Sequence, residues 1–417
     1  MPRSPKHALS TRLDSEKALR NSESTSESEL ISESAPPLDV KSPLISESTP
    51  SPCAKPSSCP KSPSAPRLSP PSLLALHWSM FKRNRRAYYS LLLFALLFVL
   101  SLGAEFVAND KPLFIYKDSK AYFPVLFDYP ETTFGGDFES FTNYLDPYVS
   151  DVLLEDALVI RAPIPYSYDS IIMDLSAPAP TSLDSKHWLG TDDKARDVAA
   201  RLLYGLRVSI LFALALSVCS IILGVGFGAL QGYYGGLVDL LGQRLIEILN
   251  AVPILFVIII ISSVFEPSFW WILCVVASFA WLGLVNLVRA EFLKVRNLEY
   301  VKAAKALGVG DVRIMFRHIL PNAMSATLTF APFIMAGGVV SLGSLDFLGF
   351  GMPVGSPSLG ELLAQGKNNL TSPHLAITAF GAFALLLSVL VFIGEGLRDA
   401  LDPHITLSIS ESGAENI

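Results

Sequence analysis

The sequence predicts an all-α integral membrane protein with six transmembrane helices. Hydrophobic residues make up 51% of the 417 positions and charged residues only 17%, whereas soluble domains carry about a quarter charged residues. Six apolar segments are each long enough to cross a bilayer, which takes about 20 residues of helix. The chain has no basic excess, which argues against nucleic acid as a partner.

Residues 1–76 form a tail ahead of the first apolar segment. Up to about residue 72 they are dominated by Ser, Pro and Glu, with almost no aromatic side chains. Such a composition buries too little apolar surface to offset the entropy of ordering. We therefore expect a disordered cytoplasmic tail at this end, and a second short cytoplasmic tail at residues 404–417.

The first transmembrane helix is expected within residues 77–107. A basic cluster at residues 82–86 precedes the apolar run Tyr88–Val107, and basic flanks tend to stay in the cytoplasm. The helix therefore runs from inside to outside. Residues 108–205 follow as a long polar connection, and loops of this length usually carry structure of their own. We expect an irregular external loop domain there, with some strands.

The other five helices are expected in a core of residues 206–403. Their apolar segments lie at about 207–231, 245–264, 269–289, 322–345 and 374–397. Counting from the first helix, both termini and the loops 232–244 and 290–321 fall in the cytoplasm. The 290–321 loop is rich in Lys and Arg, whereas the 265–268 turn has neither. This distribution agrees with the excess of basic residues usual in cytoplasmic loops.

The loop Glu299–Asn322 is the most informative part of the chain. Ala, Lys, Leu and Glu favour a short helix over its first nine positions, and Gly308 fits the residue after a helix end. A second helical turn from Asp311 is expected to end against Pro321. Small side chains at positions 303 and 304 keep one face thin enough for another protein to approach. On physical grounds alone, a helix lying on anionic lipid fits equally well.

This loop resembles the Glu-Ala-Ala loop of bacterial ABC importer permeases, whose helix inserts into a cleft of the ATPase subunit. Five positions match the family spacing: Ala303, Ala304, Gly308, Leu320 and Pro321. Lys302 stands where the family has Glu, so we expect docking to rest on shape and small residues more than on a carboxylate. The resemblance implies these ATPase-docking residues: Glu299, Tyr300, Lys302, Ala303, Ala304, Gly308, Arg313, Leu320 and Pro321.

Three flanking motifs, His187–Val198, Asp346–Gly366 and Gly396–Pro403, are similar to the dipeptide/oligopeptide permease group of OppC/DppC type. Two external segments, Ala108–Leu113 and Tyr129–Phe138, resemble its YejE branch, which serves peptide and microcin C uptake. The resemblance implies a MetI-like fold and one half of a translocation path in the bacterial inner membrane. It also implies a second permease, ABC ATPase subunits and a periplasmic substrate-binding protein as partners, besides membrane lipid.

Two smaller groups of residues are further candidates. Gly224, Gly228 and Gly232 recur on one face of the second helix, a spacing that lets helices approach closely in lipid. We expect packing within the permease pair in preference to a gating hinge. Thr191 and Asp192 are expected to cap the helix that enters the membrane. Possible periplasmic contacts are Asp192, Asp193 and Asp346, although for Asp346 we favour a solvated position at the interface that caps the following turn.

Signals of enzymatic chemistry are weak. Gly360–Lys367 resembles a phosphate-binding loop but has the wrong glycine spacing and lacks the final Ser or Thr, and the histidines lack metal-ligand spacing. We therefore expect no enzyme activity, metal or cofactor in this chain, with ATP and Mg bound by the partner ATPase. Alternatives are a related permease for nickel or glutathione, an ATPase-independent transporter, and a membrane-anchored scaffold.

Overall fold

The computed structural model describes residues 73–175 and 177–401, which fall in one compact unit. The tail predictions for residues 1–72 and 404–417 concern positions outside the described residues. The boundary of the N-terminal tail is corrected, because a helix, α2 (Leu73–Arg83), begins before residue 76. It is followed by α3 (Arg85–Leu102), whose N-terminus is capped by the Asn84 side chain.

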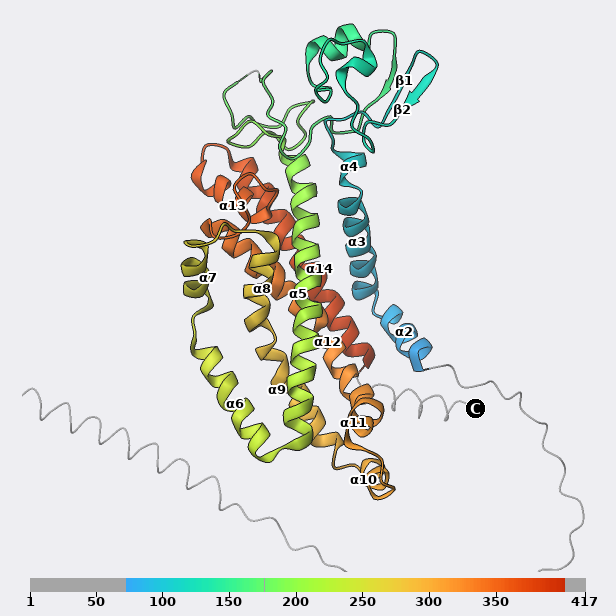
Figure 1. The fold of residues 1–417 in the computed structure, drawn as a ribbon, viewed down its shortest axis with the longest axis vertical. Coiled ribbons are helices and arrows are strands. Elements are labelled where there is room, and N and C mark those ends of the chain that lie inside the picture. The colour runs from blue at the N-terminus through green and yellow to red at the C-terminus, as the bar shows by residue number, and fades with distance from the viewer. Residues whose placement is uncertain (1–72, 176, 402–417) are drawn as a thin grey trace, which may run out of the picture. The chain divides into compact units, whose positions relative to one another are not determined.

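Four helical stretches are long and apolar enough to cross a membrane (Figure 1). They are α3, α5 (Val198–Tyr234), the run Asp311–Leu348 and α14 (Pro373–Leu401). Two bent pairs supply further spans: α6 (Gly236–Ala251) with α7 (Ile254–Ser262), bent by 64°, and α8 (Phe269–Ala280) with α9 (Leu282–Val295), bent by 40°. With each pair counted as one span, the six predicted spans are confirmed.

Several predicted boundaries are wrong. Residues 236–244, expected as a loop, belong to α6, whose polar side chains Asp239 and Gln243 pair with Arg289 of α9 and Gln231 of α5. Only Gly235, with a φ of 65°, separates α5 from α6. The helix from Asp311 does not end against Pro321. It continues from α11 (Asp311–Ile314) through a π-helical turn, Met315–Ile319, into α12 (Leu320–Leu348), where proline in the first turn needs no N–H.

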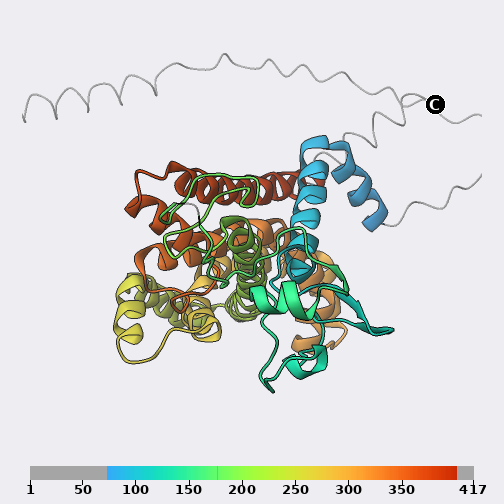
Figure 2. The ribbon, with the colours of Figure 1, turned by 90° about the horizontal axis from the view of Figure 1, so that it is seen from above.

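Helix α5 lies at the centre of the bundle and packs closely against α9 (Figure 2). A Cβ atom added at Gly224, Gly228 or Gly232 would lie 2.9, 2.8 or 2.5 Å from the Cβ atoms of Leu284, Val288 and Phe292 respectively. The predicted close packing of this glycine face is confirmed. Its partner, however, is a helix of the same chain and not of a second permease.

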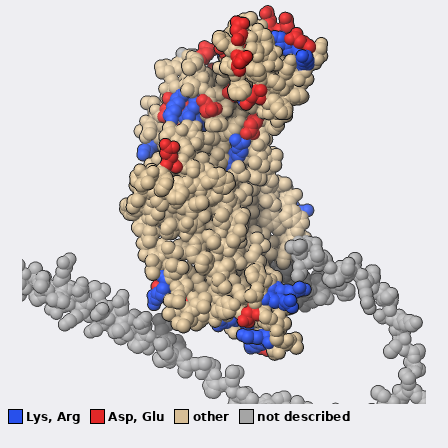
Figure 3. All heavy atoms as spheres, viewed as in Figure 1, with Lys and Arg blue, Asp and Glu red and all other residues tan. Residues whose placement is uncertain are grey.

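Residues 108–175 and 177–197 contain a small domain with strands, whereas residues 198–205, expected as part of the insert, already belong to α5. The domain follows α4 (Ala104–Val107), and its antiparallel sheet has the order β2-β1-β3, with β1 at Phe114–Lys117, β2 at Lys120–Tyr122 and β3 at Leu158–Ile160. Two short helical turns, Glu131–Phe134 and Val149–Leu153, cover a core around Ile115 and Phe134. Figure 3 shows charged side chains gathered at the two ends of the molecule, with an uncharged band between them.

Candidate functional site

The loop between α9 and α12 folds as the sequence predicts. Helix α10 (Glu299–Ala306) ends at Leu307, and Gly308 follows with a φ of 79°, which L side chains rarely adopt. The amide of Val309 donates to the carbonyl of Ala304, 3.2 Å away, so the turn after α10 satisfies a carbonyl at the helix end. This left-handed glycine directs the chain from α10 into α11.

Helix α10 is anchored on the rest of the chain by its inner face. Val301 and Ala304 are buried in one apolar cluster with Phe292 of α9 and Ile319 of the π-helical turn. The Tyr300 hydroxyl accepts a 2.9 Å hydrogen bond from the Asn322 side chain at the start of α12. Burial and hydrogen bonding therefore fix α10 to both flanking membrane helices.

The same region is tied to the end of α5. Arg296, which follows α9, donates to the carbonyls of Gly232 and Tyr233 at 3.1 and 3.0 Å. These are among the carbonyls that a helix C-terminus leaves without an intrahelical partner. The Tyr233 hydroxyl donates in turn to the Asp311 carboxylate at the start of α11. Three membrane helices thus meet at α10.

Most of the predicted docking residues are exposed, some on the outer face of α10 and the others further along the loop. Tyr300, Lys302 and Ala303 are exposed, and Lys302 pairs with Glu299 at 3.1 Å. Further along the loop, the exposed or half-exposed positions are Gly308, Arg313, Leu320 and Pro321. Ala304 is the exception. It is only 7% exposed and faces the chain's own core, because it lies about 100° around the helix from Ala303, on the same face as the buried Val301. The expectation that both alanines face a partner is therefore corrected.

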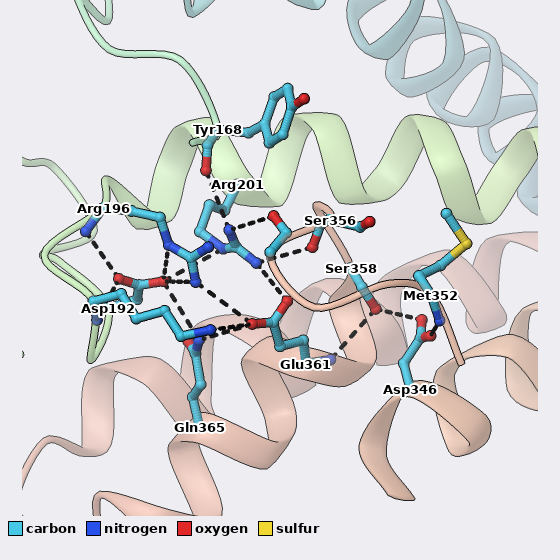
Figure 4. A network of polar contacts seen from close by, with 12 residues as sticks. Tyr168, Asp192, Arg196, Arg201, Asp346, Met352, Ser356, Ser358, Glu361 and Gln365 are labelled. Carbon is cyan, nitrogen blue, oxygen red and sulfur yellow. Dashed lines mark hydrogen bonds and ion pairs between the residues drawn. The ribbon is translucent and has the colours of Figure 1, made fainter. Parts of the chain in front are cut away.

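A buried network of charges lies at the other end of the molecule (Figure 4). Arg201 in the first turn of α5 is fully buried, and its guanidinium donates to the Glu361 carboxylate at 2.7 Å. The same guanidinium also donates to the carbonyls of Tyr168 and Ser356. Asp192 lies 2.6 Å from Arg196 and 3.5 Å from Arg201. The network joins the segment before α5 to α13 (Leu359–Asn368).

Asp346 near the end of α12 forms an adjoining polar group. Its carboxylate accepts hydrogen bonds from the amide of Met352, at 2.6 Å, and from the Ser358 hydroxyl. Ser358 caps the N-terminus of α13 by accepting from the amides of Gly360 and Glu361. Asp346 therefore organises the turn between α12 and α13. Of its two predicted roles, the structure supports capping of this turn.

The external acidic residues differ from expectation. Asp197 and not Asp192 caps α5, accepting from the Ala200 amide at 2.9 Å. Asp192 is fully buried with its arginine partners, so the prediction of a periplasmic contact there is wrong. Asp193 is exposed, and desolvation by the adjacent loops together with the Asp192 carboxylate raises its pKa.

Arg196, Arg201, Glu361 and Gln365 complete the network and were not predicted. Arg201 stands shortly before the expected start of the apolar segment at about position 207, which was the available signal for a special role. Its partner Glu361 lies 160 residues further along the chain, so nothing local in the sequence pairs them. Among residues 73–175 and 177–401, no three His, Cys, Asp or Glu side chains are grouped to hold a metal ion.

Comparison with known proteins places the chain among transport proteins. Residues 224–407 match the model of the family "Binding-protein-dependent transport system inner membrane component". The inner membrane ABC transporter permease protein YejE of Escherichia coli is 54% identical over 81% of this chain and 98% of its own length. The peptidoglycan transport system permease protein YejE of Agrobacterium fabrum is 49% identical over 79% of this chain and 92% of its own length.

A more distant relative extends the group. The oligopeptide transport system permease protein OppC of Haemophilus influenzae is 36% identical over 57% of this chain and 77% of its own length. These relatives are transport components and not enzymes, which confirms that prediction for this chain. The assignment of this chain to a family rests on its match with nearly the full length of the Escherichia coli YejE protein. The chain belongs to the family of inner-membrane permease subunits of binding-protein-dependent ABC transporters, and two YejE proteins are among its close relatives.

Proposed function

We propose that this permease couples to a separate ATPase subunit through α10 and imports peptides or peptide-like compounds. The observation that supports coupling most directly is the outer face of α10. It exposes Tyr300, Lys302 and Ala303, while Val301 on its inner face is buried in an apolar cluster with residues of α9 and α12. A movement of the ATPase against the outer face would therefore displace α10 together with the helices that pack against its inner face.

The connections of α10 support transmission as a rigid body. Packing beneath Val301 links it to α9 and α12, and the Tyr233–Asp311 hydrogen bond links the loop to α5. Packed elements shift between discrete arrangements instead of deforming continuously. When the ATPase closes on ATP, α10 would carry these helix ends with it and change access to the translocation path.

The remaining partners follow from the same arrangement. The ATPase subunits would bind ATP and Mg, and this chain would bind neither. A second, homologous permease would complete the path, and a periplasmic binding protein would deliver the substrate. Both termini and α10 would lie in the cytoplasm, an orientation that the Lys and Arg residues of the 290–321 loop support.

The external domain supplies a surface suited to the binding protein. Residues 121–160 contain no Lys or Arg. Their acidic residues are Asp128, Glu131, Asp137, Glu139, Asp146, Asp151, Glu155 and Asp156. Exposed aromatic side chains such as Phe138 and Phe141 lie among them. Charge complementarity raises association rates, so a binding protein with a basic, partly apolar face would be favoured here.

The substrate class proposed for this permease follows the names of similar proteins. Similar chains are described as serving peptidoglycan and oligopeptide transport, and a glutathione permease is 34% identical over 53% of this chain. We propose short peptides, including modified peptides of the microcin C type. The test is uptake of a labelled tripeptide, a peptidoglycan-derived peptide and glutathione by cells with and without this chain. Loss of peptide uptake is expected on deletion, whereas loss of glutathione uptake alone would contradict the substrate class.

A further inference from the structure

A pocket of about 480 Å³ lies where α2 and α3 meet the end of α14 (Figure 2). Arginines from the junction of α2 and α3 form one wall, and carboxylates from α14 form the other. The lining consists of Arg83, Asn84, Arg85, Arg86, Phe392, Glu395 and Asp399. The pocket shares no residue with the docking loop around α10, so it calls for a separate explanation.

The two walls touch beside these charges. A Cβ atom added at Gly396 would collide with the Cβ atom of Ala87, so α14 and α3 are in direct contact at this point. Ala87 directly follows Arg86, and Gly396 directly follows Glu395. The contact between the helices therefore brings a cationic and an anionic side chain to the same small space.

The charged groups of the pocket are open to a ligand. All three arginines and both carboxylates are exposed. In the part of the chain that the structure describes, none of the five forms an ion pair. The preference for basic residues in the cytoplasm accounts for the arginines but not for the carboxylates across from them. The pocket is therefore suited to a ligand that carries both charges.

Two helices independently place the pocket at the edge of the hydrocarbon core. Helix α3 is 18 residues long, which is about 27 Å, close to the core thickness of about 30 Å. Its first residues, Arg85 and Arg86, therefore lie at one edge. Residues 375–394 of α14 carry no charge, and about 20 helical residues cross the core, so Glu395 lies at an edge as well. Phe392, 41% exposed, lines the pocket one turn before it, toward the acyl chains.

Helix α2 carries further marks of the membrane surface. Trp78 is 47% exposed, and the Lys82 ammonium lies 5.3 Å from the centroid of its ring. Tryptophan is enriched where acyl chains give way to head groups. Four basic residues lie within positions 82–86, and such clusters beside a transmembrane helix attract lipid head groups. A phospholipid head group is therefore the ligand that this depth supplies.

We propose that the pocket binds the head group of one phosphatidylethanolamine. Its phosphate contacts Arg85 and Arg86, its ammonium contacts Glu395, and its acyl chains stay in the bilayer. Guanidinium groups pair favourably with phosphate oxygens, and an ammonium with three N–H donors satisfies a carboxylate, which a purely anionic head group does not. The bound lipid joins the first span, α3, to the last, α14. The inference rests on the proposed function only for which leaflet supplies the lipid.

Native mass spectrometry of the purified full chain tests the proposal. The chain is exchanged into phosphatidylethanolamine, phosphatidylglycerol or phosphatidylcholine with identical acyl chains, and the lipids that survive delipidation are counted. One phosphatidylethanolamine should survive, and the other two lipids should be lost. Arg85→Gln with Arg86→Gln should weaken its retention roughly tenfold. Glu395→Gln, which leaves the basic flank intact, should retain phosphatidylethanolamine no better than phosphatidylcholine.

Matched controls remove charges outside the pocket. Arg398→Gln lies on the same helix, and Glu291→Gln removes a carboxylate of α9; both should retain the lipid. Equal retention of phosphatidylglycerol, or unchanged retention in Glu395→Gln, would overturn the proposal. Displacement by soluble glycerophosphoethanolamine would assign the pocket to a soluble zwitterion and overturn it as well. Neither uptake nor ATPase binding is measured, so failure here leaves the ATPase coupling untouched.

Discussion

At the scale of single residues, the conformation of Gly308 decides how α10 is presented. Its φ of 79° disfavours any side chain, and a β-branched one most, at a cost of about 1–3 kcal/mol. Gly308→Val should therefore lower uptake strongly while the protein still inserts. Gly310→Val is the matched control, since Gly310 has a φ of −64° and open space around it. Equal uptake by the two variants at equal abundance would show that the turn after α10 is unimportant.

The buried ion pair gives a second prediction at this scale. Arg201 and Glu361 share one network, so removing either partner leaves an uncompensated charge. Arg201→Met and Glu361→Met should each lower the melting temperature of the full chain in detergent. The double variant should lose less than the sum, with a coupling of about 1–3 kcal/mol. Additive losses would mean that the two side chains do not stabilise each other.

The same residues show where sequence reasoning reached its limit. The helix at Glu299–Ala306 and its glycine stop depend on local propensity, and both were predicted correctly. Burial of Asp192 depends on Arg196, four residues further on, and on Arg201, whose charge also pairs with Glu361 of the distant helix α13. The pairing of Arg201 with Glu361 joins positions far apart in the sequence, so no local pattern predicted the network and Asp192 was assigned to the surface.

At the scale of elements, the contact between α5 and α9 is the most extensive helix pair in the described part of the chain. A side chain at position 228 would collide with the Val288 side chain and the Val285 carbonyl. Gly228→Val should force the helices apart, and less folded chain should reach the membrane. Gly226→Ala, two residues away in open space, should behave as wild type when folded protein is measured by size-exclusion chromatography. Normal yields of Gly228→Val would show that α5 and α9 pack less closely than described.

The element scale also separates what hydropathy can predict from what it cannot. Long apolar runs such as α14 are found directly, because bilayer thickness fixes their length. Helix α6 was missed in part because Asp239, Gln243 and Arg244 interrupt its apolar side. Asp239 pairs with Arg289 of α9, and Gln243 donates to Gln231 of α5. Tertiary partners thus stabilise a helix that its own composition does not reveal.

For the whole molecule, orientation in the membrane is the first prediction. In a chain without its four native cysteines, Tyr148→Cys on the external domain should react with a membrane-impermeant thiol reagent in intact cells. Lys305→Cys on α10 should react only after the membrane is opened. The reason is the excess of basic residues on the α10 side. Labelling of Lys305→Cys in intact cells would contradict the cytoplasmic location of α10.

The central claim is that α10 docks a separate ATPase through shape and small side chains. Co-purification of the ATPase with the tagged permease from membranes tests it most directly. Ala303→Arg places a large side chain on the outer face of α10 and should abolish co-purification, whereas Ala303→Ser and Lys302→Glu should retain it. Abundance of the permease should be unchanged in all three. If the ATPase co-purifies with Ala303→Arg as well as with wild type, docking through α10 is wrong.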